Sequence, residues 1–259
     1  MKKIINYLKK LKKQDVIAVK QSLEDEGASF DELKIMRQIT RKAGLQLNIK
    51  VGGCEAKTDI YFCEKIGVNG IVAPMVESDY ALRKFIQIIS KNKKQNLYIN
   101  LESIQAFKNI NNIIKTKNFK KLTGVVIGRS DLAGSLNLQK SEVDSKKIYS
   151  LVFNLLKKLR RKKIITKMGG SLTPRSLDFA KQLFDLKLLD RIETRNIEIK
   201  LSNKVFSNFD ELIIDIFNFE LEWIRFKQKR FSKVKNRIKN DNSSRIHELK
   251  KRIKSLRGE

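Results

Sequence analysis

Short apolar runs alternate along the chain with longer amphipathic runs. The short runs are rich in Ile, Val and Leu and have the length of strands, whereas the longer ones repeat apolar residues at helical spacing. The predicted strands are Val16–Lys20, Leu47–Val51, Gly70–Ala73, Leu97–Leu101, Gly124–Ile127, Ile164–Met168 and Arg191–Glu193. The predicted helices are Phe30–Ala43, Ala56–Ile66, Asp79–Ser90, Ser103–Thr116, Lys146–Leu159 and Pro174–Leu183. This alternation predicts βα units around a parallel sheet.

Most units recur at about 25–30 residues, the size of one βα repeat. The fold class is therefore α/β, and we predict a TIM-type (β/α) barrel. Such a barrel needs eight strands, and the pattern supplies only seven. The missing strand is expected before Val16, where residues 1–13 look helical and basic. We predict an N-terminal helix over residues 1–13, a barrel with a modified or missing first strand over residues 14–207, and a basic helical extension over residues 208–259.

The extension begins with a predicted long helix from Phe209 to about Arg237. Its apolar stripe consists of Leu212, Ile216, Phe219 and Trp223. A stripe of this kind is typical of a core or subunit-contact face. The segment Asp241-Asn-Ser-Ser is expected to break the helix, and Ser244–Leu256 is expected to form a short charged one. We expect this extension to pack on a neighbouring subunit of a homo-oligomer.

The net charge of +28 lies mainly at the two ends of the chain. Residues 225–259 hold 14 basic and 3 acidic side chains, and residues 1–20 hold 7 and 1. The joint abundance of Lys, Ile and Asn is typical of an AT-biased genome, which places lysines on solvated surfaces. Because no RNA-binding or zinc-finger pattern accompanies the charge, nucleic acid is an unlikely partner.

No run approaches the roughly 20 apolar residues of a membrane span, and the first residues lack the features of a signal peptide. Cys54 and Cys63 show no pairing pattern and fit a reducing compartment. We therefore expect a cytoplasmic protein without a membrane partner.

Two acidic residues follow neighbouring predicted strands. Glu102 comes directly after Leu97–Leu101, and Asp131 lies shortly after Gly124–Ile127. In barrels the carboxyl ends of the strands form one rim, where active sites lie. Two carboxylates there would repel each other unless a cation lay between them, and such oxygen ligands suit Mg²⁺ or Mn²⁺. The spacing alone equally allows Asp131 to act only as the N-cap of the next helix.

Two glycine pairs also follow predicted strands, Gly52-Gly53 and Gly169-Gly170. Their backbone N–H groups could bind an anion, although tight turns use the same residues. The other polar residues expected at this rim are Glu24, Glu26, Glu193 and Arg195. The last two could equally form an internal salt bridge.

The only histidine, His247, lies in the charged extension. A histidine base and any Ser–His or Cys–His nucleophile are therefore excluded within the barrel. Cys54 is predicted to be a packed residue, because no histidine is available to activate it. Catalysis would have to rely on a metal that polarises a carbonyl group.

Three segments carry a family resemblance. They are Gly67-Val-Asn-Gly-Ile-Val-Ala-Pro-Met-Val-Glu-Ser-Asp-Tyr-Ala, Ile99-Asn-Leu-Glu-Ser-Ile-Gln-Ala-Phe and Gly124-Val-Val-Ile-Gly-Arg-Ser-Asp-Leu-Ala-Gly. In order and spacing, residues 45–195 resemble the HpcH/HpaI aldolase and citrate lyase family of phosphoenolpyruvate/pyruvate-binding barrels. The resemblance implies cleavage or formation of a C–C bond next to a 2-oxo acid or acyl-CoA, with an enolate held on Mg²⁺ or a similar ion.

By position, the resemblance implies that Glu102 and Asp131 are the metal ligands. Lys50 occupies the place of an arginine that the family's aldolases usually carry, and it offers one point charge in place of a bidentate fork. The family's histidine-containing segment is replaced by Leu23-Glu-Asp-Glu-Gly, so Glu24 or Glu26 is expected to substitute as the acid or base.

The predicted site therefore has three groups of residues. Metal binding is assigned to Glu102 and Asp131, catalysis to Lys50, Glu24 and Arg195, and substrate binding to Gly52, Gly53, Gly128, Arg129 and Ser130, where Arg129 replaces a common proline of the family. The predicted function is a metal-dependent carbon–carbon lyase acting on a 2-oxo acid or related carboxylate. One alternative is a non-catalytic metal-binding barrel that serves as a scaffold or regulator, and another is nucleic-acid association through the basic tail.

Overall fold

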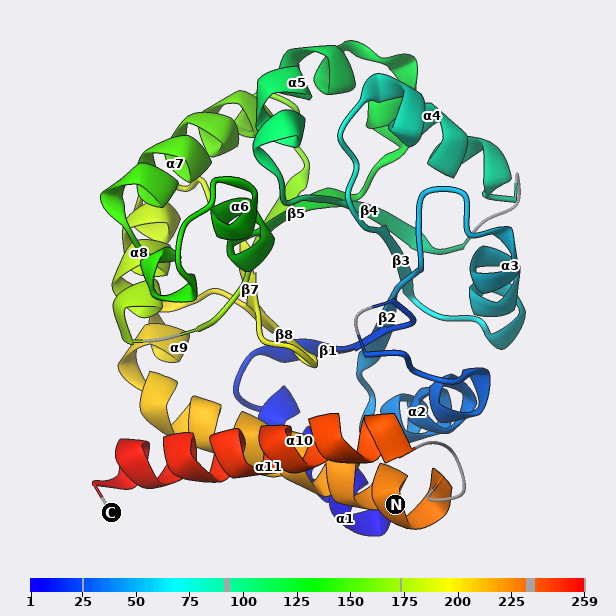
Figure 1. The fold of residues 1–259 in the computed structure, drawn as a ribbon, viewed down its shortest axis with the longest axis vertical. Coiled ribbons are helices and arrows are strands. Elements are labelled where there is room, and N and C mark those ends of the chain that lie inside the picture. Colours follow the sequence, from blue (N-terminus) through cyan, green and yellow to red (C-terminus); the bar gives the residue numbers. More distant parts are fainter. Residues whose placement is uncertain (25, 91–93, 173, 232–235, 259) are drawn as a thin grey trace.

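A computed structural model shows the chain as a closed barrel of eight strands in sequence order, β1 to β8 (Figure 1). The structure describes residues 1–24, 26–90, 94–172, 174–231 and 236–258. The strands are β1 (Val16–Ser22), β2 (Gln46–Lys50), β3 (Gly70–Ala73), β4 (Asn96–Leu101), β5 (Gly124–Gly128), β6 (Ile165–Gly169), β7 (Arg191–Glu193) and β8 (Ile197–Lys200). The TIM-type barrel is confirmed, and the seven predicted strands are present to within two residues at each end.

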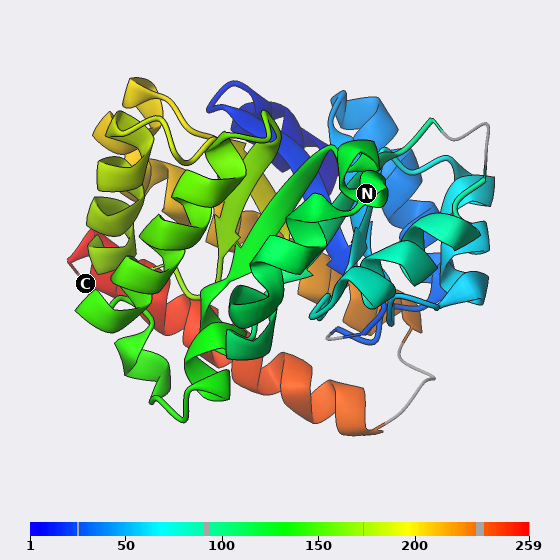
Figure 2. The same ribbon diagram turned by 90° about the horizontal axis from the view of Figure 1, so that it is seen from above.

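Helices surround the barrel, and β1 to β6 each lead into one of them (Figures 1 and 2). They are α1 (Lys2–Lys12), α2 (Phe30–Ala43), α3 (Lys57–Ile66), α4 (Asp79–Ile88), α5 (Ile104–Lys115), α6 (Arg129–Ser135), α7 (Lys146–Arg160), α8 (Pro174–Asp185), α9 (Asn203–Ser207), α10 (Phe209–Phe231) and α11 (Asn236–Arg257), with short 3₁₀ turns η1 (Lys117–Lys121) and η2 (Lys140–Glu142). The six predicted βα helices also agree to within two residues.

Side-chain caps fix where the helices begin. Ser29, Ser78, Ser103 and Ser145 each accept a backbone N–H from the first turn of α2, α4, α5 and α7. Such caps satisfy N–H groups that have no partner within the helix. Gly44 and Gly67 end α2 and α3 in the left-handed conformation, which glycine adopts without steric cost.

The eighth strand follows β7, so the expectation that the missing strand would precede Val16 is wrong. β8 is antiparallel to both β7 and β1, and it closes the barrel between them. The turn at 194–196 holds itself together through Thr194, whose hydroxyl accepts the backbone N–H of Ile197 at 3.1 Å and whose own N–H donates to the Ile197 carbonyl at 2.9 Å. A four-residue strand behind a turn without glycine gives no hairpin signal in the sequence.

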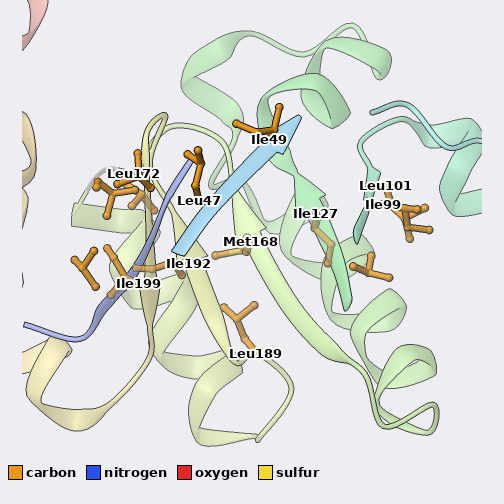
Figure 3. Close-up of a cluster of buried hydrophobic side chains, with 14 of the residues drawn as sticks. Leu47, Ile49, Ile99, Leu101, Ile127, Met168, Leu172, Leu189, Ile192 and Ile199 are labelled. Atoms are coloured by element: carbon orange, nitrogen blue, oxygen red, sulfur yellow. The ribbon is translucent and has the colours of Figure 1, made fainter. Parts of the chain in front are cut away.

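The main hydrophobic core lies between the outer face of the barrel and the surrounding helices (Figure 3). Outward-facing strand residues such as Leu47, Ile99, Ile127 and Ile192 have no exposed surface. Residues of α1, α10 and α11 belong to the same core, including Leu8, Trp223 and Leu249. One continuous core therefore ties both terminal segments to the barrel.

Buried ion pairs occupy the side of the barrel bore formed by β1, β6, β7 and β8. Lys167 on β6 lies 2.7 Å from Glu198 on β8, and Arg191 on β7 lies 2.6 Å from the same carboxylate. Burial opposes the ionisation of Glu198, but the two cations hold its pKa below the ordinary value. Lys20 on β1 adds a further pair, at 2.6 Å from Glu193. On this side the inward strand positions are thus charged, whereas Val72, Tyr98 and Val126 of β3 to β5 form a small apolar cluster, closer to the branched apolar filling of many barrels.

The C-terminal helices pack on the chain's own barrel. Helices α10 and α11 lie side by side next to β1 and β8 (Figure 1). The predicted apolar stripe of α10 is confirmed as a core face. The helix α10 is described as far as Phe231; the predicted end at about Arg237 depends on residues 232–235, which lie outside the described part. The predicted break at Asp241-Asn-Ser-Ser is wrong, because α11 runs through it.

Leu249 and Ile253 of α11 are buried within the chain. The extension therefore packs on its own barrel, while its packing on a neighbouring subunit and homo-oligomer formation stay predictions. Within the described residues, no helix is both long and apolar enough to cross a membrane.

Candidate active site

A cavity of about 420 Å³ opens at the carboxyl ends of the strands. Its floor is polar, and its walls come from the strand ends, the loops that follow them, and helices α10 and α11. The residues used below that line it are Lys20, Glu24, Glu26, Lys50, Met75, Asn100, Glu102, Gly128, Ser130, Asp131, Lys140, Gly169, Gly170, Leu172, Glu193, Arg195, Phe217, Arg245, Glu248 and Arg252. The cavity therefore unites most of the predicted site residues.

Glu102 follows β4 and is almost fully buried at the cavity wall. Its Oε1 accepts the Met75 N–H at 3.0 Å, and its Oε2 accepts the Asn100 side-chain amide at 2.9 Å. Burial raises the pKa of Glu102 against the lowering effects of the Met75 N–H, of Lys50 and of Asn100, and the nearby Asp131 carboxylate raises it further. A cation between the two carboxylates would relieve this electrostatic cost.

The backbone around Glu102 is shaped to hold that carboxylate. Met75, after β3, has a φ of +48°, a left-handed conformation that is uncommon for a residue other than glycine. Strained backbone of this kind concentrates at functional sites, and here it accompanies the N–H donated to Glu102. A Cβ at Gly128 would lie 2.7 Å from Glu102 Oε2, so only glycine leaves the carboxylate in this position.

Asp131 lies in the first turn of α6, and the N-cap of that helix is Gly128. The alternative that Asp131 serves only as an N-cap is therefore wrong. Asp131 lines the cavity together with Glu102. No cluster of three or more His, Cys, Asp or Glu side chains able to hold a metal ion occurs in the described part of the chain. Glu102 and Asp131 are two of the carboxylates that line the cavity, together with Glu24, Glu26, Glu193 and Glu248.

Lys50 and Glu24 form an ion pair of 2.8 Å across the ends of β1 and β2. Glu24 keeps 40% of its side chain exposed, while Lys50 keeps 13%. Arg195 lies in the β7–β8 turn, where its Nε donates to Glu26 at 3.1 Å, and Asn196 donates to the same carboxylate oxygen at 2.8 Å. The structure therefore brings the three predicted catalytic residues to one cavity, where Glu26 holds the turn and Glu24 stays partly exposed.

The glycine pairs differ in their placement. Gly169 and Gly170 line the cavity with Gly128 and Ser130. Gly170 has a φ of +90°, and a Cβ there would lie 2.6 Å from the Ser130 nitrogen, so the loops after β5 and β6 meet only because it is glycine. Gly52 and Gly53 are not among the described residues that line the cavity, and the Gly52 N–H donates to Asp59 at 2.8 Å.

Arg129 has no exposed surface and cannot contact a ligand, so its assignment to substrate binding is corrected. Its guanidinium pairs with the Asp144 carboxylate and donates from Nε to the Gly169 carbonyl at 3.2 Å and from Nη2 to the Gly170 carbonyl at 2.5 Å. It also lies over the Phe179 ring. Arg129 thus holds the loop after β6 in place through the backbone carbonyls of Gly169 and Gly170.

Several lining residues were absent from the prediction. Asn100 lies on β4 two positions before Glu102, so along an extended chain both side chains point to the same side, and the Asn100 amide donates to the carboxylate. Lys20 sits at a polar inward position of β1, a signal that could have been read from the lysine within an apolar run. The α11 residues Arg245, Glu248 and Arg252 had no local signal, because tertiary packing alone brings that helix to the cavity.

Comparison with known proteins identifies the family of the chain. The model of the HpcH/HpaI aldolase/citrate lyase family matches residues 29–166, which is more than half of the chain. The chain belongs to this family. The matched region contains Lys50, Glu102 and Asp131, whereas β7, β8 and helices α10 and α11 lie outside it. No curated protein matches the chain at a significant level.

Several solved structures, two of them named as members of the family, share the fold. An HpcH/HpaI aldolase from Desulfitobacterium hafniense DCB-2 is similar with a TM-score of 0.62 and 11% identity, over 73% of this chain and 81% of that one. The citrate synthase SbnG is similar with a TM-score of 0.60 and 13% identity, over 80% and 86%. A family protein from Burkholderia cenocepacia J2315 gives 0.60 and 12%, over 73% and 82%. At these identities the likeness concerns the fold.

Proposed function

We propose that the chain is a metal-dependent carbon–carbon lyase that acts on a 2-oxo acid or a related carboxylate through an enolate. The observation that carries the proposal is the buried Glu102 carboxylate next to Asp131 at the rim of a barrel of this family. Because burial and the neighbouring negative charge both disfavour ionisation of Glu102, the pair suits a divalent cation. Oxygen ligands of this type suit Mg²⁺ or Mn²⁺.

Glu102 and Asp131 would hold the ion, and water and the substrate's own oxygens would complete its coordination. Asn100 supports the fit, because its Oδ1 is buried at the cavity wall and accepts no hydrogen bond from the described residues. A bound ion would polarise the 2-oxo group and offset the negative charge that develops on its oxygen.

The protein's own residues supply the remaining chemistry. Lys50 brings positive charge to the same part of the cavity, where its field already acts on Glu102. Glu24 is held by Lys50 and is partly exposed, so we assign it to removing and returning the proton at the carbon next to the carbonyl. Arg195, in the turn between β7 and β8, also lines the cavity, and we assign it to anchoring a substrate carboxylate.

The direct test is Mn²⁺ titration of wild type, Glu102→Gln, Asp131→Asn and a control, Glu211→Gln, on the exposed surface of α10. Wild type and control should bind alike, while the two site variants should bind at least about tenfold more weakly, since each loses one charged ligand. Equal Mn²⁺ binding by all four proteins would falsify the assigned metal site.

A second measurement addresses the chemistry. Pyruvate in D₂O should exchange its methyl protons in the presence of Mn²⁺ and wild type, as followed by ¹H NMR. Glu24→Gln should slow the exchange without weakening Mn²⁺ binding. Intact metal binding with no exchange, and no cleavage of a panel of 4-hydroxy-2-oxo acids, would point to the non-catalytic alternative.

A further inference from the structure

Helix α11 forms one wall of the cavity, although it lies more than a hundred residues after β4 and β5, the strands that Glu102 and Asp131 follow. Arg245, Glu248 and Arg252 line the cavity together with Glu102 and Asp131. The helix is fixed in place by the buried side chains of Leu249 and Ile253. The wall is therefore part of the folded core and belongs to the same chain as the floor.

Arg245 ties this helix to α10. Its Nη2 donates to the buried carboxylate of Glu220 at 3.1 Å, and its Nη1 donates to Glu248 at 3.0 Å. Arg245 thus engages the carboxylates of Glu220 and Glu248. The contact between Arg252 and Glu248 is longer, at 3.8 Å.

Arg252 is held in a defined orientation at the cavity. Its guanidinium lies over the Phe217 ring, 4.7 Å from the centroid, and its Nη2 donates to the Leu172 carbonyl at 2.5 Å. About a third of its side chain, 32%, remains exposed. A guanidinium carries five N–H donors in a planar fork that matches the oxygens of a carboxylate or phosphate.

Near the α11 wall, positively charged side chains outnumber the carboxylates described above. Lys140, from η2, lines the same cavity, and its charge acts on Glu248 together with those of Arg245 and Arg252. The cavity volume of about 420 Å³ falls in the range of about 300–1,000 Å³ that is usual for ligand sites and leaves room beyond a three-carbon acid. The α11 residues line the same cavity as Glu102 and Asp131, so a longer ligand held at these carboxylates has α11 among the walls available to its far end.

We propose that Arg252 is a specificity-determining residue that binds a carboxylate or phosphate group at the end of the substrate remote from the 2-oxo acid. The inference rests on the proposed function for the position of the reactive end. It concerns a helix outside the matched family region, so the family alone does not supply it. Phe217 and Leu172 orient the guanidinium before the substrate arrives, which lowers the entropic cost of binding.

The test measures binding to the Mn²⁺-loaded protein by calorimetry. The probes are 2-oxoadipate, 2-oxohexanoate, and a 2-oxo acid of equal length that ends in a phosphonate. The variants are Arg252→Met and, as matched control, Arg257→Met, which removes an exposed arginine from the same helix. Wild type and control should prefer the charged-end probes about tenfold to hundredfold over 2-oxohexanoate, as expected for a charge-assisted hydrogen bond.

Arg252→Met should lose this preference while keeping its affinity for 2-oxohexanoate and for Mn²⁺. A purely structural role would weaken all probes equally, so loss of selectivity is the distinguishing result. The phosphonate and carboxylate probes decide which oxyanion is preferred. Retention of the preference in Arg252→Met, or its absence from wild type, overturns the inference.

Glutarate separates this inference from the proposed function, because it lacks the 2-oxo group. Wild type should bind glutarate more tightly than Arg252→Met does, whatever happens at the reactive end. Equal glutarate binding refutes the role of Arg252. If 2-oxo acids instead bind no better than the matching simple acids, the proposed function fails while the role of Arg252 stands.

Discussion

Replacing Arg129 with methionine should destabilise the fold strongly and leave ligand affinity nearly unchanged. The substitution keeps an apolar stem that can pack on Phe179 but removes the guanidinium from Asp144 and from the Gly169 and Gly170 carbonyls. Breaking a buried ion pair by removing one partner costs about 3–5 kcal/mol. Typical domains have only about 5–15 kcal/mol of stability in total, so the loss should be visible in any unfolding curve.

Urea unfolding followed by circular dichroism measures the effect. The midpoint should fall while the slope stays the same, because the surface exposed on unfolding is similar. Arg160→Met, at a half-exposed position of α7, is the control, and its weak 3.9 Å contact predicts a change below about 1 kcal/mol. In Arg129→Met/Asp144→Leu the loss should be partly recovered, since neither buried charge then remains.

A loss of less than about 1 kcal/mol in Arg129→Met would refute this account. So would wild-type stability combined with weaker binding of 2-oxo acids, because that result would return Arg129 to the ligand-contact set. The double variant gives a further check. If it is less stable than Arg129→Met, then Asp144 contributes more than its pairing with the guanidinium.

Three further predictions follow from other positions. Gly128→Ala should weaken Mn²⁺ binding about tenfold or more in a folded protein, because the new Cβ would lie 2.7 Å from the carboxylate oxygen of Glu102; unchanged affinity would argue against this crowding. Burial raises the pKa of Glu220 above the ordinary value of 4.5, so the folded state binds this proton more tightly than the unfolded state and loses stability as the pH rises from 4.5 through the raised pKa. Glu220→Gln should flatten the dependence of the unfolding free energy on pH over this interval, and an unaltered dependence would contradict the prediction. Burial raises the pKa of Cys54 to about 11 and that of Cys63 to about 12, so both thiols should react slowly with a disulfide reagent at pH 8 until the protein is unfolded, and rapid native labelling would be the contrary result.

The sequence predicted the parallel part of the barrel because its strands and helices carry their own signals. Apolar runs of strand length alternate with amphipathic runs, and serines or glycines mark helix ends. Glu102 and Asp131 could be located as a pair because they follow neighbouring strands, and the barrel geometry then places both on one rim. For Asp131 the spacing alone allowed a metal ligand or a helix cap, and the family resemblance favoured the metal ligand.

The parts that escaped prediction depend on tertiary contacts. β8 has four residues and follows a turn without glycine, so its pairing with β1 becomes visible only in the closed barrel. Arginine is usually exposed, so the sequence suggested a surface position for Arg129. Its burial is explained by the ion pair with Asp144, which only the folded structure shows. The position of Arg252 depends on how α11 docks, which no local pattern in that charged segment encodes.

The β7–β8 hairpin has a consequence for how this cavity can change. Most barrel enzymes acquire new substrates by lengthening or replacing the flexible βα loops of a fixed scaffold. In this chain a tight turn joins β7 to β8 in place of a long loop. The cavity wall beside it is helix α11, which the buried side chain of Leu249 anchors. One residue inserted into a helix rotates everything beyond it by about 100°. An insertion between Leu249 and Arg252 would therefore turn the arginine away from the cavity, so in this sector substrate range is coupled to helix register and to the stability of the core.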